Sequence, residues 1–242
     1  MGASPILTAR SRSRASLRPN ASYTDPDVTG LRAVAALACA LSCAAPARAQ
    51  EKKPIGGFVI DVRGAFARHK LEPSVATELG VVPANLPARS YGLITGAHVY
   101  PFHLGKITFG FGGEFVYARG RHTLAPATDG GPAGPTARRH FESLAPEISF
   151  NFGHRNGWSY ISGGMFGRSK LYVDRADAPA SGAPWRSTIN YGGGARLFTN
   201  HRLAFSVDFR WFSNAEQPAN STGVVLQPRT TLLVLSGGIA IR

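Results

Sequence analysis

Cysteine is almost absent from this sequence of 242 residues. The two cysteines, Cys39 and Cys43, both lie in a short apolar segment near the N-terminus. The rest of the chain has none, which excludes disulfide bonds, thiolate metal sites and cysteine nucleophiles there. A protein of this size without disulfides must be held together by its own closed hydrogen bonding or by a large core.

Long apolar runs are also missing. After residue 49, no stretch approaches the roughly 18 apolar residues that a membrane-spanning helix needs. Charged residues make up only 17% of the chain, whereas glycine (28 residues) and aromatic residues (10%) are plentiful. This composition favours a β-protein over a helical one.

The N-terminal segment has the features of a secretory signal. Residues 34–45 are apolar, Arg32 precedes them, and Ala47-Arg48-Ala49 follows as a small-x-small cleavage site. We therefore expect residues 1–49 to be an extension with a cleaved signal peptide, and residues 50–242 to form one domain. About thirty residues rich in Arg and Ser precede the signal, which a start codon assigned too far upstream would explain. A transit peptide, or a lipoprotein signal ending at Cys39 or Cys43, remains an alternative.

Acidic residues are scarce relative to basic ones. The formal charge is +13, and the part after residue 49 keeps 21 basic and 12 acidic residues. Such an excess is common in nucleic-acid-binding proteins. Export argues instead for an anionic surface outside the cytoplasm, so we expect no nucleic-acid partner.

Strict alternation of apolar and polar side chains is the strongest pattern, and it is clearest in residues 203–211 (LAFSVDFRW). A period of two indicates a strand with one apolar face. Similar runs occur at 57–68, 89–102, 106–121, 138–153, 158–171, 186–199, 203–213 and 229–242. Pro146 is tolerated within its run only at a bulge or a local break of the ladder.

The connections between these runs alternate regularly between long and short. We expect long loops at 69–88, 123–137, 172–185 and 214–228, and tight turns at 103–106, 154–157 and 200–201. Long outer loops alternating with short periplasmic turns are typical of an outer-membrane barrel. The sequence thus predicts an all-β fold: an eight-stranded antiparallel up-and-down transmembrane β-barrel with both ends in the periplasm.

The two faces of each strand then acquire directions. Aromatic faces should meet lipid, because a Lys or Arg there costs about 2–4 kcal/mol at mid-membrane. Charged faces should line the narrow lumen, where we expect a network of Asp61, Arg63, Glu114, Glu147, Arg196, Asp208 and Arg210. We interpret it as a packed polar plug, since eight strands leave little room for a channel. A small pore or proton path is the alternative, and a soluble lipocalin-like barrel would reverse the faces.

These features resemble the small outer-membrane barrels of the OmpA/OmpX type, over about residues 54–242. The resemblance implies a Gram-negative outer-membrane protein, without cofactor and monomeric. The strand 233–242 (LVLSGGIAIR) looks like the signal that the barrel-assembly machinery recognises. The family usually ends in an aromatic residue, whereas this chain ends in Arg242.

Basic residues gather where strands meet the long loops. We call them the basic rim: Arg68, Arg89, Arg119, Arg121, Arg138, Arg139, Arg168, Lys170 and Arg186. Arginine binds phosphate through two parallel hydrogen bonds, so we predict a collar that contacts lipopolysaccharide. A generic solvated rim is the alternative.

One stretch is similar to the outer-membrane lipid A deacylases, which carry a His-x-Ser-Asn-Ala motif. Ser213, Asn214 and Ala215 match its last three residues, but Trp211 stands at the position of the basic histidine. A serine without a base is a poor nucleophile. We therefore expect no catalytic site and no metal or cofactor site. The predicted function is that of a non-enzymatic surface barrel for envelope integrity, adhesion or surface interaction, with a lipid A acyl hydrolase or a small pore as alternatives.

Overall fold

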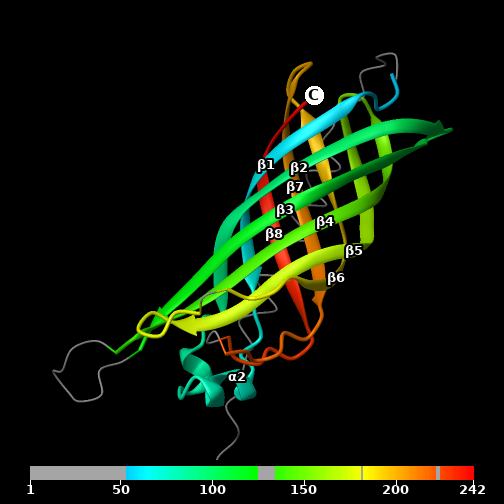
Figure 1. Ribbon diagram of the computed structural model, residues 1–242. Coiled ribbons are helices and arrows are strands. Elements are labelled where there is room, and N and C mark those ends of the chain that lie inside the picture. Colours follow the sequence, from blue (N-terminus) through cyan, green and yellow to red (C-terminus); the bar gives the residue numbers. More distant parts are fainter. Residues whose placement is uncertain (1–52, 125–133, 181, 222–223) are drawn as a thin grey trace, which may run out of the picture. The chain divides into compact units, whose positions relative to one another are not determined.

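The computed structural model describes residues 53–124, 134–180, 182–221 and 224–242, so the expected signal segment lies outside the described residues. In the described part the chain forms eight strands that close into a single antiparallel barrel in sequence order (Figure 1). The strands are β1 (Phe58–Arg68), β2 (Arg89–Leu104), β3 (Ile107–Thr123), β4 (Thr136–His154), β5 (Gly157–Arg175), β6 (Arg186–Phe198), β7 (Leu203–Asn214) and β8 (Thr230–Ile241). The predicted fold class is confirmed.

Closure depends on the pairing of the first strand with the last. β8 pairs with β7 on one side and with β1 on the other, from Ile60↔Ile241 to Arg68↔Leu233. The expected irregularity around Pro146 is present, because the β4–β5 register shifts between Leu144 and Ile148. Further register shifts occur in β2–β3 and β5–β6.

The barrel is apolar outside and polar inside, the reverse of a soluble barrel. Along β7, Phe205, Val207 and Phe209 are exposed, whereas Ser206 and Asp208 between them are buried. Side chains alternate across a strand, so one sequence pattern fixes both surfaces. No helix among the described residues is long and apolar enough to cross a membrane.

The three short turns lie at one end of the barrel, together with the start of β1 and the end of β8. We call it the short-turn end. The other is the long-loop end. At the long-loop end β3, β4 and β5 continue beyond their neighbours. Toward this end, Tyr91↔Arg119 is the last pair between β2 and β3, and Ser169↔Arg186 is the last pair between β5 and β6. The projecting three-stranded part is visible at the lower left of Figure 1 and shortens two of the predicted loops.

The predicted loop 69–88 is wrong in part, because it contains α2 (Pro73–Glu78) and the 3-10 turn η1 (Pro83–Asn85). Proline is tolerated in the first turn of a helix, where no intrahelical donor is needed. Val75 and Ala76 of α2 are buried with Val173 of β5. The predicted two-residue turn at 200–201 is also longer, since β6 ends at Phe198 and β7 begins at Leu203. The Asn200 side chain accepts hydrogen bonds from the backbone N–H groups of Arg202 and Leu203, both at 2.8 Å.

The lumen is filled in three layers. Charged residues occupy the middle. Toward the long-loop end lies an apolar layer of Ala65, Ala67, Ile94, Val116, Ala118, Phe141, Ala145, Leu171, Phe212, Leu232 and Val234. Toward the short-turn end lies a second one, of Ile55, Val59, Tyr100, Trp158, Tyr160, Ala204 and Ala240. The charged layer of the plug therefore lies between two apolar layers.

Candidate functional site

Two arginines organise the charged layer of the lumen. Arg63 donates to Asp61 at 2.9 Å and to Glu114, and it lies 3.5 Å from Asp208. Arg210 donates to Glu147 and lies 3.3 Å from Glu114 and 3.2 Å from Asp208. Both guanidinium groups are inaccessible to solvent. Each of the four carboxylates thus lies within ion-pair distance of an arginine, as buried charges require.

A third arginine extends this network toward the short-turn end. Arg196 donates to Asp61 at 2.6 Å and to the Tyr100 hydroxyl at 3.0 Å, and its guanidinium lies 4.7 Å from the centre of the Tyr160 ring. The Tyr160 hydroxyl donates to Asp208 at 2.9 Å. Neither tyrosine was predicted as part of the network. Both tyrosines could have been found from the alternation of side chains, the same pattern that assigned the charged residues to the lumen.

His98, also unpredicted, completes the layer. Its ring nitrogens lie 3.6 Å from Asp61, 3.9 Å from Glu114 and 3.4 Å from Glu147. Ligand atoms of Asp61, His98 and Glu114 lie within 4.8 Å of one another, a spacing compatible with a metal ion. Arg63, however, donates to both of these carboxylates and already supplies the positive charge. The cluster is an ion-pair network built around guanidinium groups.

At the long-loop end, the exposed arginines face outward from neighbouring strands. Arg68 and Arg89 are direct cross-strand partners, and so are Arg121 and Arg138. Like charges directly opposite each other are destabilising unless something neutralises them. Arg138 has such a partner, because Asp174 accepts two hydrogen bonds from it at 3.0 Å. The exposed members of the basic rim are Arg68, Arg89, Arg119, Arg121 and Arg168, while Arg138, Lys170 and Arg186 are half-buried.

Glu142 lies among these residues and offsets only part of their charge. It is 4.0 Å from Arg119 and 3.8 Å from Lys170. Lys170 also lies over the Trp185 ring, 4.7 Å from its centre. Within the rim, Arg119, Arg138 and Lys170 thus have carboxylate neighbours.

Arg139 does not belong to the exposed rim, contrary to expectation. It is only 3% exposed and lies on the lumen side of β4, the side of Phe141. The alternation of the strand sends Arg138 and His140 outward and Arg139 inward. Arg139 donates to the Lys70 carbonyl at 3.2 Å, and its remaining buried nitrogens have no hydrogen-bond partner among the described residues.

His69 lies close to Arg139 at the mouth of the lumen, beyond the lipid-facing part of β1. It is 7% exposed, and its Nε2 is 2.8 Å from the Ser90 hydroxyl. Burial, and then the positive charge of Arg139, lowers the pKa of His69 to about 3. The ring is therefore neutral in the folded protein over the physiological range.

This histidine predicts a loss of stability in acid. The unfolded chain binds a proton near pH 6.5 and the folded one only near pH 3, so stability falls as the pH drops through that interval. In the His69→Gln variant, the decrease in the free energy of unfolding between pH 7.5 and pH 4 should be smaller than in the wild type by on the order of 2–3 kcal/mol. Urea unfolding followed by tryptophan fluorescence at both pH values measures it. A decrease in His69→Gln equal to that of the wild type would contradict the assignment.

The serine of the deacylase-like stretch lies in a setting without a base. Ser213 is half-buried in β7, and its cross-strand neighbours are Ile189 and Thr231. Trp211 stacks on Tyr191, with ring centres 5.6 Å apart. None of these side chains can take a proton from a serine hydroxyl at neutral pH.

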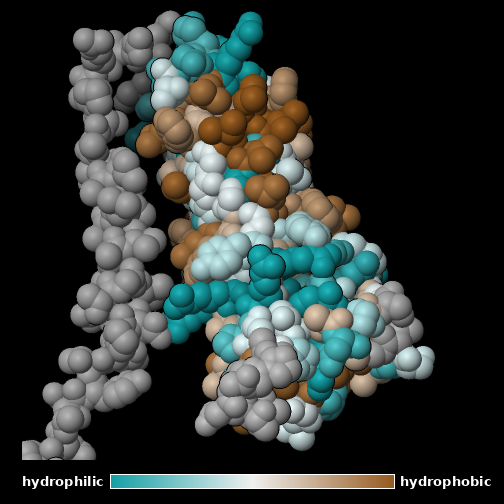
Figure 2. Space-filling view, turned by 90° about the vertical axis from the view of Figure 1, so that its left-hand side faces the viewer, coloured by the Kyte–Doolittle hydropathy of each residue, from teal (hydrophilic) through white to brown (hydrophobic). Residues whose placement is uncertain are grey.

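The outer wall of the barrel carries a broad apolar surface. Figure 2 shows hydrophobic residues over the upper half of the wall, between hydrophilic residues at the top and a hydrophilic band lower down. Exposed apolar side chains include Phe58 (52%) on β1, Leu93 (57%) on β2 and Phe166 (83%) on β5. Such a surface around a closed barrel with a charged interior is the arrangement of an outer-membrane protein. The predicted localisation in the outer membrane agrees with it.

Comparison with known proteins gives similarities of fold at low sequence identity. Neisserial surface protein A is 13% identical, with a TM-score of 0.46, over 77% of this chain and 97% of that protein. The attachment invasion locus protein Ail of Yersinia pestis is 12% identical, with a TM-score of 0.43, over 77% and 99%. The outer membrane protein OprG from Pseudomonas aeruginosa is 14% identical, with a TM-score of 0.42, over 79% and 98%. No protein-family model and no curated protein sequence matches the chain.

Proposed function

We propose that this outer-membrane barrel acts at the cell surface without catalysis, and that its basic rim binds the phosphates of lipopolysaccharide. The observation that carries the proposal is the cluster of exposed arginines, Arg89, Arg119, Arg121 and Arg168, that the strands β2, β3 and β5 present just beyond the apolar wall. Clustered arginines are stabilised when an anion lies between them. In the outer leaflet, that anion is the phosphate of lipid A.

The orientation follows from the connections. The long-loop end faces the outside and the short-turn end faces the periplasm, as in other barrels of this architecture. With this orientation, the rim lies at the level of the outer-leaflet headgroups. The loops above it, together with the projecting parts of β3, β4 and β5, form the surface that other molecules meet.

The lumen supports a non-conducting role. Arg63, Arg196 and Arg210 fill its centre, and an apolar layer lies on each side of them. An eight-stranded barrel is just wide enough for its side chains. The surface role is therefore favoured over the small pore. It is also favoured over an acyl hydrolase, because neither cross-strand neighbour of Ser213 can act as a general base.

Both edges of the sheet are used in closure, since β1 and β8 pair with each other. A barrel without a free edge has no strand left for pairing with another copy. We propose that the protein is a monomer in the membrane and that the barrel-assembly machinery recognises β8.

The rim is tested by replacing Arg119, Arg121 and Arg168, all exposed, with Gln. The triple variant should unfold at a temperature several degrees lower than wild type in lipopolysaccharide-containing micelles. In neutral detergent the two proteins should unfold at the same temperature. The shift of the folded band on heat-modifiability gels reports the transition. Arg139 is left out, because removing a buried cation would destabilise the barrel in either medium.

The matched control replaces the same three arginines with Lys. This variant keeps the charge and loses the planar, bidentate geometry, so its transition should fall between those of wild type and the Gln variant. Equal destabilisation of the Gln variant in both media would refute phosphate binding by the rim.

A further inference from the structure

The described segments at the short-turn end are basic and contain no acidic side chain. The segments that form it (53–60, 99–110, 150–160, 197–206 and 239–242) contain five Lys or Arg, three His and no Asp or Glu. The rim at the other end differs, because Glu142 and Asp174 lie among its arginines. Cations that gather without acidic side chains in the described segments create a positive potential that attracts anions.

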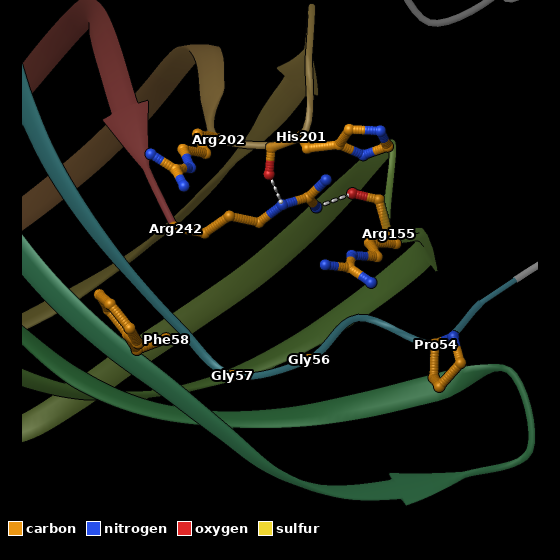
Figure 3. Close-up of a pocket in the computed structure, with 8 residues that line it drawn as sticks. All are labelled: Pro54, Gly56, Gly57, Phe58, Arg155, His201, Arg202 and Arg242. Carbon is orange, nitrogen blue, oxygen red and sulfur yellow. Dashed lines mark hydrogen bonds between the residues drawn. The ribbon is translucent and has the colours of Figure 1, made fainter.

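A pocket of about 460 Å³ opens at this end (Figure 3). Gly56, Gly57 and Phe58, at the start of β1, line one side of it. Arg155 from the β4–β5 turn, Arg202 from the β6–β7 turn and Arg242 after β8 line the other. Three separate parts of the chain thus bring one guanidinium group each to the same cavity.

Arg242 is fixed in place between the two turns. It donates to the His201 carbonyl at 2.9 Å and to the Arg155 carbonyl, as the dashed lines in Figure 3 show. Its guanidinium lies 3.7 Å from the centre of the Phe198 ring. A side chain held by two carbonyl groups and one aromatic ring has already lost its rotamer freedom, so a ligand does not bear that cost on binding.

One donor of the Arg242 guanidinium is left free by the described residues. Its Nη2 is buried and has no hydrogen-bond partner among them. Burial, and then the positive charge of Arg155, lowers the pKa of Arg242. A bound anion would satisfy the free nitrogen and offset the repulsion between the two arginines.

We propose that this pocket is a phosphate-binding site, in which Arg155, Arg202 and Arg242 hold the phosphate of an anionic phospholipid headgroup or a free phosphate ion. Arginine offers paired donors that match phosphate oxygens. Gly57, with φ of +73° and no atom within 4 Å of a built Cβ, keeps the opposite wall open. In the proposed orientation, the pocket lies at the inner leaflet, where phospholipid headgroups are abundant. The site is independent of the rim at the long-loop end.

The test titrates the folded protein in dodecylmaltoside with two probes, inorganic phosphate and dihexanoyl phosphatidylglycerol. The amide signals of Gly56, Gly57 and His201 report binding by nuclear magnetic resonance. The double variant Arg155→Gln with Arg202→Gln should bind more weakly, with a dissociation constant at least fivefold higher than that of the wild type. These two side chains are exposed and bear no packing role, so the double variant should fold.

The control is Lys53→Gln with Lys106→Gln, which removes the same charge from the same end without touching the pocket. It should bind as wild type does. Saturable shifts with both probes would identify the phosphate itself as the ligand, and shifts with the lipid alone would identify the headgroup; either supports the site. No saturable shift with either probe, or equal weakening by the control, would overturn it.

Discussion

Replacing Arg210 with Met should lower the free energy of unfolding by about 3–5 kcal/mol, the largest effect expected of any single substitution in the lumen. Arg210 is fully buried and contacts Glu114, Glu147 and Asp208. Methionine fills a similar length but leaves these buried carboxylates with fewer cationic partners. Removing one side of a buried ion pair leaves an uncompensated charge, which is why the cost is large.

Urea unfolding of the barrel in liposomes or detergent micelles, read by tryptophan fluorescence, measures this effect. Arg119→Met removes the same chemical group from the exposed rim and should cost less than about 1 kcal/mol. Adding Glu147→Gln to Arg210→Met should recover part of the loss, since one carboxylate then no longer needs a partner. A loss below 1 kcal/mol for Arg210→Met alone would show that the network is not a structural plug.

Gly238→Ala should destabilise the barrel by about 1–3 kcal/mol, and its neighbour Gly237→Ala should change it little. A Cβ at Gly238 would lie 2.2 Å from the Val62 carbonyl oxygen and 2.6 Å from the Arg63 Cα, across the seam where the barrel closes. These are backbone atoms, so β8 would have to move away from β1. At Gly237, which faces outward, the nearest atom would be 3.8 Å away.

Each variant adds one methyl group to the wild type, and the two positions are adjacent in one strand. The effect of strand propensity is therefore the same in both. The folded fraction on heat-modifiability gels, followed by the urea midpoint, gives the comparison. Equal stabilities of the two variants would mean that the seam can widen without cost.

Alternation of side chains was sufficient to predict the strands, and the rhythm of long and short connections predicted the membrane-spanning architecture and with it the lipid-facing sides. Phe205, Val207 and Phe209 are exposed and Asp208 and Arg210 are buried because a strand permits no other arrangement once one face is assigned. The bulge at Pro146 was also predictable, because proline cannot donate to the ladder. These features depend on neighbours in the sequence.

Features that depend on the register around the barrel were not predictable. Arg196 meets Asp61, and Tyr160 meets Asp208, only because eight ladders place these residues at one height. The apolar layers above and below the charges were missed for the same reason, although Phe141 and Phe212 each lie on the predicted lumen face. Arg139 was assigned to the rim from its position in the sequence, whereas the side of the strand decides its direction.

Helix α2 was missed because its signal is weak. It has six residues, and Pro73 and Pro83 normally indicate a loop. Its stability comes from packing against Val173 of β5, a contact with a strand about a hundred residues away. Tertiary packing of this kind outweighs local propensity in short helices.

The barrel closes only when β1 pairs with β8, the strand farthest from it in the sequence. The first strand is the last to gain its second partner, because that partner ends at Ile241. Until then its backbone donors and acceptors are open, and a strand edge in this state pairs readily with other chains. Contacts so distant in sequence also form slowly. Competition between closure within one chain and association between chains therefore sets the yield of folded barrel, and dilution favours closure.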